Sequence, residues 1–149
     1  MSETRTLRPA AQYGPTAATV AENVKRLRKC RSLSIYQLSA QLRAAGRPIT
    51  PSAVGKIERQ QRQVTVDDLA AMAVILSVSP SALLLPLTDD PGSKVEITGV
   101  GPVAADEAWD WVDGRRRLDR PCSDLGAAAL EFALYSRPPI RRSKEIGRG

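Results

Sequence analysis

Thr50, Ser52 and Lys56 lie close together in the sequence and end in groups that bind nucleic acid or other polyanions. A lysine ammonium donates hydrogen bonds to guanine O6 or N7, and a serine hydroxyl donates to or accepts from several base edges. Amide groups at the start of a helix bind phosphate. This chemistry requires the three residues to lie on the exposed beginning of a helix that is supported from behind.

Two short helices joined by a turn are predicted over residues 33–58 and would provide that support. Ser34 and Gln37 lie three residues apart and form the pattern of a capping box at the start of the first helix. Gly46 and Pro48 are expected to end this helix.

The second helix of the pair is expected to begin after Thr50, which acts as its cap. Pro51 follows at the first helical position, where its missing N–H is tolerated. Ser52 and Lys56 then fall on or near the exposed side. The apolar spacing predicts a buried seam between the two helices, made by Leu38, Leu42, Val54 and Ile57.

Three more helices are predicted around this pair. One spans residues 17–31, with Thr19 and Glu22 resembling a capping box and an apolar face made by Val20, Val24 and Leu27. Another begins after Thr65, with an apolar stripe formed by Val66, Leu69, Ala70, Ala73 and Leu76. A short fifth helix is expected from residue 80 to 85.

The C-terminal part follows a composition break at residues 88–93. We expect a short strand near residue 95, a helix over 103–113, a helix over 124–136 and a frayed basic end. Trp109 and Trp111 are two apart, so either one is buried and the other lines a pocket or interface, or both are buried. The 124–136 helix has more apolar surface than one face can bury, which favours packing against another subunit.

The net charge of +6 is concentrated in one part of the sequence. Residues 17–87 contain ten Lys or Arg against four Asp or Glu, whereas residues 88–149 are near neutral. This split indicates that the basic part meets a polyanion, although basic faces also serve solubility. We therefore expect a flexible arm over 1–16, a binding domain over 17–87 and an extension over 88–149.

Composition excludes several classes of function. The chain has no His, which excludes a zinc site and a His-dependent catalytic triad. No apolar run reaches about 18 residues, and the N-terminus lacks the apolar segment of a secretory signal. Cys30 and Cys122 show no metal-ligand spacing, and two unpaired thiols are expected rather than a disulfide. We expect no cofactor, no metal and no membrane partner.

The runs NVKRLRKCRSLSIYQLSAQL and VGKIERQQRQVTVDDLAAMAVILSVSPSALL resemble the Cro/C1-type (XRE family) helix-turn-helix domain of bacterial and phage repressors. The extended form is similar to regulators of high-GC actinobacteria. The resemblance covers residues 20–87 through Leu27, Arg28, Leu33, Leu38, Ser39, Val54, Ile57, Glu58, Leu69, Leu76, Val78, Leu83 and Leu84. It implies a mainly all-α fold class: a five-helix lambda-repressor-like domain with a smaller C-terminal extension containing a short strand and helices.

The resemblance also implies roles for individual residues. Ser52 and Lys56 match base-contacting positions, with Pro51 and Ala53 beside them, and Thr50 matches a position that meets phosphate. A buried salt bridge is implied for Arg28 and Glu58, the alternative being an exposed, unpaired arginine. Further DNA backbone contacts are expected from Arg26, Arg43, Arg47, Arg59 and Arg62.

Two features depart from the family pattern. Ile35 occupies a position where the family often has a phosphate-binding Gln, so that contact is missing or made by the backbone. The turn RAAGRPIT is longer than usual, which changes the expected angle of the following helix. The enlarged turn makes Arg43 and Arg47 candidates for backbone contacts, with ordinary surface charge as the alternative.

The sequence supports a non-enzymatic regulator of transcription, with repression the expected mode. It would bind double-stranded DNA in the bacterial cytoplasm, at the nucleoid, as a homodimer. The alternative is an antitoxin-like protein-interaction module of the same fold, whose C-terminal third neutralises a partner. An enzyme is the least supported reading, because no constellation of Ser, Lys or carboxylate residues presents a reaction.

Overall fold

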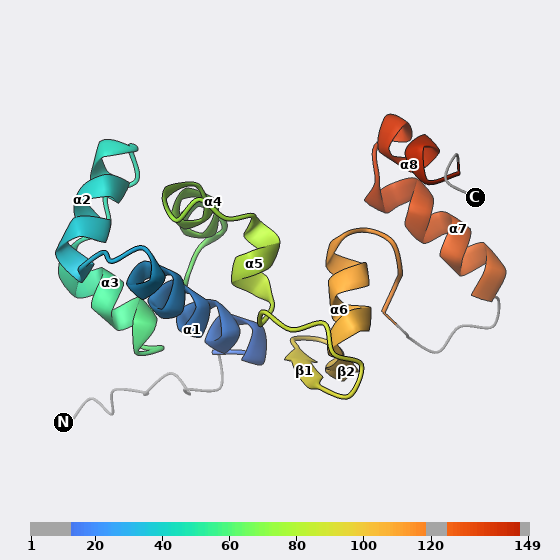
Figure 1. The fold of residues 1–149 in the computed structure, drawn as a ribbon, viewed down its shortest axis with the longest axis horizontal. Coiled ribbons are helices and arrows are strands. Elements are labelled where there is room, and N and C mark those ends of the chain that lie inside the picture. The colour runs from blue at the N-terminus through green and yellow to red at the C-terminus, as the bar shows by residue number, and fades with distance from the viewer. Residues whose placement is uncertain (1–12, 119–124, 147–149) are drawn as a thin grey trace, which may run out of the picture. The chain divides into compact units, whose positions relative to one another are not determined.

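The computed structural model describes residues 13–118 and 125–146, which divide into two compact units with a boundary between Leu84 and Leu85. The structure is 59% helical, with a small two-stranded antiparallel sheet (Figure 1). The predicted mainly helical fold class is therefore confirmed. Among the described residues, no helix is both long enough and apolar enough to span a membrane.

The first unit consists of α1 (Pro15–Cys30), α2 (Ile35–Ala44), α3 (Pro51–Glu58), α4 (Val66–Ile75) and α5 (Pro80–Leu84). These helices enclose one apolar core, whose buried members include Val20, Val24, Leu38, Leu42, Ile49, Val54, Ile57, Met72, Ala73, Leu76 and Leu83. The core is built almost entirely of aliphatic side chains, as the low aromatic content of 4% requires.

Three of the predicted helix starts are confirmed by side-chain caps. Ser34 and Gln37 form a reciprocal capping box at α2, and the Thr50 hydroxyl accepts a hydrogen bond from the Ala53 amide of α3. Thr65 also caps α4, where Asp68 completes a second capping box. These bonds satisfy amide groups that a helix leaves without partners in its first turn.

α1 begins two residues before the predicted start, and the predicted capping box of Thr19 and Glu22 is absent. The helix begins at Pro15, inside the expected flexible arm, with Gly14 as its N-cap and no side-chain cap. Thr19 lies within the helix, where its hydroxyl donates to the Pro15 carbonyl at 3.2 Å. Pro15 explains the difference, since its fixed φ suits the first helical position. The rest of the expected arm, residues 1–12, lies outside the described residues.

The predicted apolar stripe of α4 is only partly correct. Ala73 and Leu76 are buried, but Val66 is 83% exposed and Ala70 is also exposed. Met72, which the prediction omitted, is fully buried instead. An almost uniformly apolar helix leaves its buried face undefined by sequence, because several faces look equally suitable.

The second unit contains β1 (Lys94–Ile97), β2 (Gly101–Ala104), α6 (Ala105–Val112), α7 (Leu125–Ser136) and α8 (Pro139–Ile146). The strands are antiparallel and pair Val95 with Val103. Their buried side chains join Ala105 and Ala108 of α6 in a second apolar core, which also includes Leu85.

Two predictions for this unit are wrong. Residues 103 and 104 were expected to begin a helix but belong to β2, and residues 139–146 were expected to be frayed but form α8. The turn before β2 passes through Gly99 and Gly101, both at positive φ, which glycine adopts without strain. The helix expected over 103–113 is shorter, and Gly114 at φ +73° ends it as predicted. The helix expected over 124–136 is present as α7.

The structure also shows the degree of burial of both tryptophans and of Cys30. Trp109 and Trp111 are both half-buried against the second core, and the Trp109 indole N–H donates to the Pro86 carbonyl at 3.1 Å. Cys30 is an exposed free thiol. Cys122 lies outside the described residues.

Candidate nucleic-acid interface

α2 and α3 lie side by side (Figure 1), and a buried apolar seam between them supports α3 from behind. The predicted seam is confirmed, because each of its four side chains is at most 1% exposed: Leu38, Leu42, Val54 and Ile57. The turn between the helices passes through Gly46 at φ +83°. The Ser39 hydroxyl of α2 donates to the Ile49 carbonyl at 2.6 Å, which fixes the chain just before α3. α3 is thereby attached on its inner side, leaving its outer side open.

Arg28 and Glu58 connect the end of α1 to the end of α3. Arg28 Nε and Nη2 donate to the two Glu58 carboxylate oxygens at 2.5 Å and 3.1 Å, and Nη1 donates to the Leu33 carbonyl at 2.8 Å. The side chains are only 10% and 6% exposed. The implied salt bridge is therefore formed and partly desolvated, and the guanidinium also binds the α1–α2 turn.

Ser52 and Lys56 lie one helical turn apart on the exposed side of α3. Within the described residues, neither side chain has a hydrogen-bond or ion-pair partner. Thr50 is exposed but uses its hydroxyl as the helix cap. Pro51 and Ala53 are half-buried and offer apolar contact only. The structure thus brings the two predicted donors together and leaves both available.

Arg59 directly follows α3 and is its C-terminal cap. Its guanidinium lies over Gly55, where an added Cβ would meet Nη1 at 3.0 Å. Its Nε makes a long bond of 3.4 Å to Gln61 Oε1, and the residue is exposed. A larger residue at position 55 would displace this guanidinium, so Gly55 helps to position a cation beside Ser52 and Lys56.

Arg47 and Arg62, both expected at the DNA backbone, are bound instead to a buried carboxylate. Arg47 Nε lies 2.9 Å from Asp68 Oδ1, and Arg62 Nη2 lies 3.8 Å from Oδ2. Asp68 is completely buried, and Arg47 also donates to the Thr65 hydroxyl at 3.1 Å. Both arginines therefore help to neutralise Asp68, while their own side chains stay 38% and 35% exposed.

The pKa of Asp68 reflects this environment. Burial alone would raise it, because a charged carboxylate is poorly solvated inside a protein. Hydrogen bonds from Thr65 and Arg47, together with the positive charge of Arg47, outweigh that effect and hold the pKa below its ordinary value. Asp68 is therefore ionised at neutral pH and pairs with the arginines as a charge.

Arg26 and Arg43, the two remaining candidates for contact with the DNA backbone, differ in their surroundings. Arg26 is half-buried and donates to Asn23 Oδ1 at 3.2 Å, while Asn23 in turn donates to the Leu83 carbonyl at 3.0 Å. Arg26 therefore takes part in joining α1 to α5. Arg43 is exposed, and no partner engages it within the described residues.

The sequence interpretation missed two residues of this unit. Asp68 was recognisable as the fourth member of a Thr-x-x-Asp capping pattern, yet its burial depends on distant arginines. Tyr36, on α2, is 75% exposed. Its spacing from Arg43 is two helical turns, which places both on one face and is visible in the sequence.

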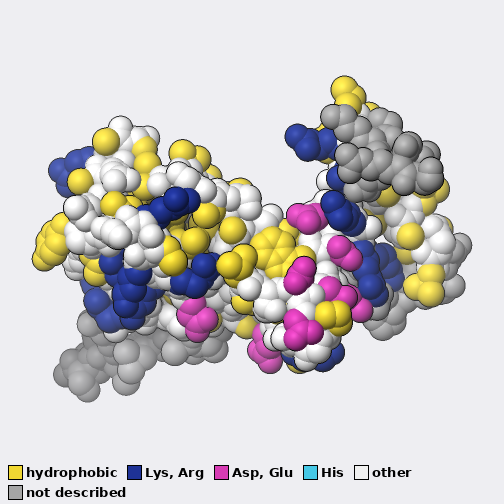
Figure 2. Space-filling model, viewed as in Figure 1, with side chains coloured by type: hydrophobic (Ala, Val, Ile, Leu, Met, Phe, Trp, Pro, Cys, Tyr) yellow, Lys and Arg dark blue, Asp and Glu magenta, His cyan; other side chains and the backbone are white. Residues whose placement is uncertain are grey.

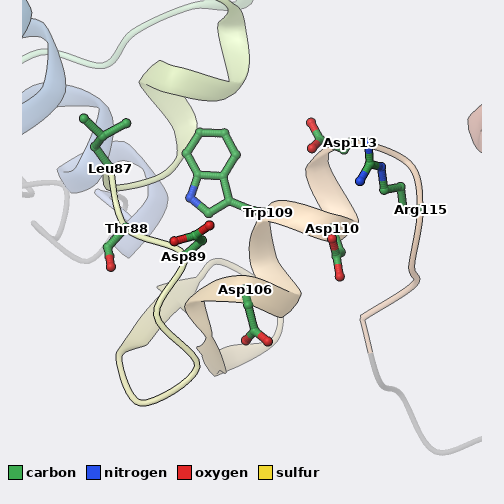
Figure 3. Close-up of a pocket in the computed structure, with 8 residues that line it drawn as sticks. All are labelled: Leu87, Thr88, Asp89, Asp106, Trp109, Asp110, Asp113 and Arg115. Carbon is green, nitrogen blue, oxygen red and sulfur yellow. The ribbon is translucent and has the colours of Figure 1, made fainter.

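The two units differ in the charge of their surfaces. Figure 2 shows Lys and Arg side chains over the part that holds α1–α3, and many Asp and Glu side chains over the part that holds β1, β2 and α6. In the second unit, a hollow of about 500 Å³ is lined by Leu87, Thr88, Asp89, Asp106, Trp109, Asp110, Asp113 and Arg115 (Figure 3). Its four carboxylates oppose phosphate binding, so the first unit is the candidate nucleic-acid surface. The described residues contain no cluster of metal-binding side chains.

The chain was compared with known proteins at three levels. No protein-family model matches it, and no match is found among curated proteins or among solved structures.

Proposed function

We propose that the first unit is a lambda-repressor-like helix-turn-helix domain of the Cro/C1 type and that the protein is a sequence-specific regulator of transcription. The observation that carries this proposal is the exposed start of α3. There, Ser52 and Lys56 have no partner within the described residues, while the opposite side of the helix is fixed by the α2 seam and by the bond from Arg28 to Glu58. Free donors on a rigid, basic support suit base recognition.

α3 would lie in the major groove of duplex DNA, with α2 crossing the backbone. Lys56 would donate to guanine O6 or N7, and Ser52 would contact a neighbouring base edge. Pro51 and Ala53 would contribute apolar contact. Thr50, Arg43 and Arg59 would approach phosphates, whereas Arg26, Arg47 and Arg62 would do so only through the part of each guanidinium that the fold leaves accessible.

A single domain of this kind contacts only a few base pairs, which favours a homodimer on a near-palindromic site. The near-neutral C-terminal part is the proposed pairing region. The protein would act in the bacterial cytoplasm, at the nucleoid, and would catalyse no reaction and require no cofactor. Repression is the expected outcome of binding near a promoter.

The experiment that tests this proposal is selection of bound duplexes from a random pool, followed by fluorescence anisotropy against the selected site over a salt series. About six phosphate contacts imply that log affinity falls with log salt at a slope of roughly −5. A matched duplex of scrambled sequence measures non-specific binding. Failure to enrich any sequence, or an affinity independent of salt, would refute the proposal.

A second function, an antitoxin-like protein-interaction module, is favoured by one observation. α7 has no buried residue, and its exposed apolar side chains include Leu125, Leu130, Leu134 and Tyr135. An uncovered face of this kind marks a protein-binding site. Under this alternative, the chain would form a stable complex with the product of a neighbouring gene and relieve its toxicity on co-expression. Absence of a toxic neighbour would leave the regulator as the better explanation.

A further inference from the structure

The outer face of α2 carries a second feature beside the start of α3. A hollow of about 420 Å³ is lined by Tyr36, Ser39, Ala40, Arg43, Ala44 and Pro51. We call it the Tyr36–Arg43 hollow. Tyr36, Ala40 and Arg43 fall at helical spacing and share one face. Pro51 is the first residue of α3, so the hollow is continuous with the surface proposed to enter the groove.

The lining separates into two chemical parts. Ala40, Ala44 and Pro51 provide small apolar surfaces, on which a sugar ring can pack. Tyr36 contributes a phenol and Arg43 a guanidinium, and both groups donate hydrogen bonds to phosphate oxygens. Neither side chain has a partner within the described residues. An apolar surface with two anion-binding donors matches the alternation of sugar and phosphate in a nucleic-acid strand.

Charge supports the same occupant. No acidic residue lines the hollow, and α2 itself contains none. The exposed basic residues of this unit include Arg43, Lys56 and Arg59. An acidic ligand is therefore attracted, and an exposed aromatic ring beside an unpaired arginine suits a strand backbone better than a neutral peptide.

Other groups on α2 are less able to bind phosphate. Ile35 packs against the apolar core. Ser34 and Gln37 use their side chains and amide groups in the capping box, with bonds of 2.8 Å and 3.1 Å. Phosphate binding on this face consequently falls to Tyr36, which is 75% exposed, and to Arg43.

Resting on the proposed function, we propose that the Tyr36–Arg43 hollow seats one deoxyribose and its two flanking phosphates, in the DNA strand that borders the groove occupied by α3. Arg43 binds one phosphate, and the Tyr36 hydroxyl donates to the next. Ala40, Ala44 and Pro51 pack against the deoxyribose between them. This contact fixes how far α2 sits from the strand and hence the depth at which Lys56 meets the bases.

The test uses the full chain, the selected duplex and fluorescence anisotropy. Arg43→Gln should weaken binding about tenfold and reduce the magnitude of the salt slope by about 1. Tyr36→Phe, which removes only the hydroxyl, should also weaken binding about tenfold, because it loses a hydrogen bond to a charged group. Tyr36→Ala should weaken it further. Arg141→Gln, which changes an exposed residue of α8, serves as the matched control for loss of charge.

A second arm locates the contact on the DNA. Duplexes are prepared in which one phosphate at a time is replaced by a neutral methylphosphonate. At one position the replacement should weaken wild-type binding, and the same replacement should have no further effect on Arg43→Gln, as expected when two changes remove one interaction. At a neighbouring phosphate, methylphosphonate should likewise weaken wild-type binding and have no further effect on Tyr36→Phe.

The outcomes separate the two proposals. If Lys56→Ala weakens binding while the Tyr36 and Arg43 variants bind like wild type at every salt concentration, the hollow does not contact DNA and this inference is overturned. If the losses are additive at every methylphosphonate position, the inference is overturned as well. If wild-type protein binds no duplex, the proposed function itself fails. Circular dichroism confirms that each variant folds.

Discussion

Lys56 and Ser52 end in donors that nothing within the described residues engages, whereas Arg28 and Arg47 are bound to buried carboxylates. An N–H group that already has a partner gains little net free energy by exchanging that bond for one to DNA, so a paired arginine has only its remaining N–H groups to offer. The basic residues of the first unit therefore divide by role. Those bound to carboxylates stabilise the fold, and the unpaired ones are the candidates for recognition.

Lys56→Ala should weaken binding to the selected site by about 1–3 kcal/mol and relax discrimination at one base pair, because a direct contact to a base edge is lost. Lys25→Ala removes the same charge from an exposed position on α1 and is the matched control. It should change affinity equally for all sequences. Anisotropy across a panel of single-base variants of the site measures both, and an unchanged base preference in Lys56→Ala would contradict the assigned contact.

Glu58→Ala should destabilise the protein by about 3–5 kcal/mol, because it strands the Arg28 guanidinium in a mostly buried position. For a domain of this size, such a loss lowers the melting temperature by more than about 10 °C. Glu22→Ala, at an exposed position of α1, should shift it very little. Thermal unfolding followed by circular dichroism compares the two. Equal, small shifts would show that the pair adds nothing to stability.

At the scale of elements, the beginning of α4 connects distant parts of the first unit. Asp68 accepts a hydrogen bond from the Thr65 amide at 3.1 Å and binds Arg47, which lies in the turn before α3. One buried carboxylate thus caps a helix and fixes the turn that precedes the candidate recognition helix. Protonation of Asp68 weakens both contacts at once.

The lowered pKa of Asp68 predicts acid sensitivity of this element. In the unfolded chain an aspartate has a pKa of about 3.9, so as the pH falls the unfolded state binds a proton before the folded state does. The stabilisation is complete above about pH 5 and is lost as the pH falls through 3.9 towards the lower pKa of the folded state. Asp68→Asn should therefore be less stable than wild type at pH 7 and lose less stability on acidification.

Urea unfolding at pH 7, 5, 4 and 3 checks this expectation. Asp67→Asn alters the exposed neighbouring carboxylate and is the matched control, which should follow the wild-type dependence on pH. Identical pH dependence in Asp68→Asn and wild type would mean that Asp68 does not link stability to protonation.

At the scale of the whole molecule, each unit has its own apolar core. The first core is closed by Leu83, and the second begins with Leu85, which is 2% exposed. Because the two cores are separate, the chain can be cut between Leu84 and Leu85 without dividing either of them. The expected binding domain therefore ends more cleanly at Leu84 than at Leu87.

A fragment ending at Leu84 should fold, remain monomeric and bind a half-site weakly, while the full chain dimerises. Dimerisation is expected through the exposed apolar residues of α7, including Leu130 at 63% and Leu134 at 48% exposure. Sedimentation velocity measures the association state of the full chain, of the fragment, and of a full-length variant that carries both Leu130→Glu and Leu134→Glu. The double variant should be monomeric. A monomeric full-length protein, or a fragment that still dimerises, would refute the pairing region.

The sequence by itself determined where most helices of the first unit begin. Capping at Ser34, Thr50 and Thr65 involves residues within three positions of one another, so the pattern is complete in the local sequence. The apolar seam of α2 and α3 was equally readable, because helical spacing places its members on one face. The caps were predicted correctly because they need no distant partner, and the seam because each helix shows its apolar face in its own local spacing.

Only the tertiary structure decided which basic groups are available and which faces are covered. Arg47 and Asp68 are 21 positions apart, and no local pattern shows that they meet. β2 exists because Val103 pairs with Val95 across a glycine turn, and the buried face of α4 depends on its neighbours. Pairing and burial are properties of distant segments brought together. For that reason the sequence named the candidate donors but did not separate the free ones from those, such as Arg47 and Arg62, that pair with a carboxylate.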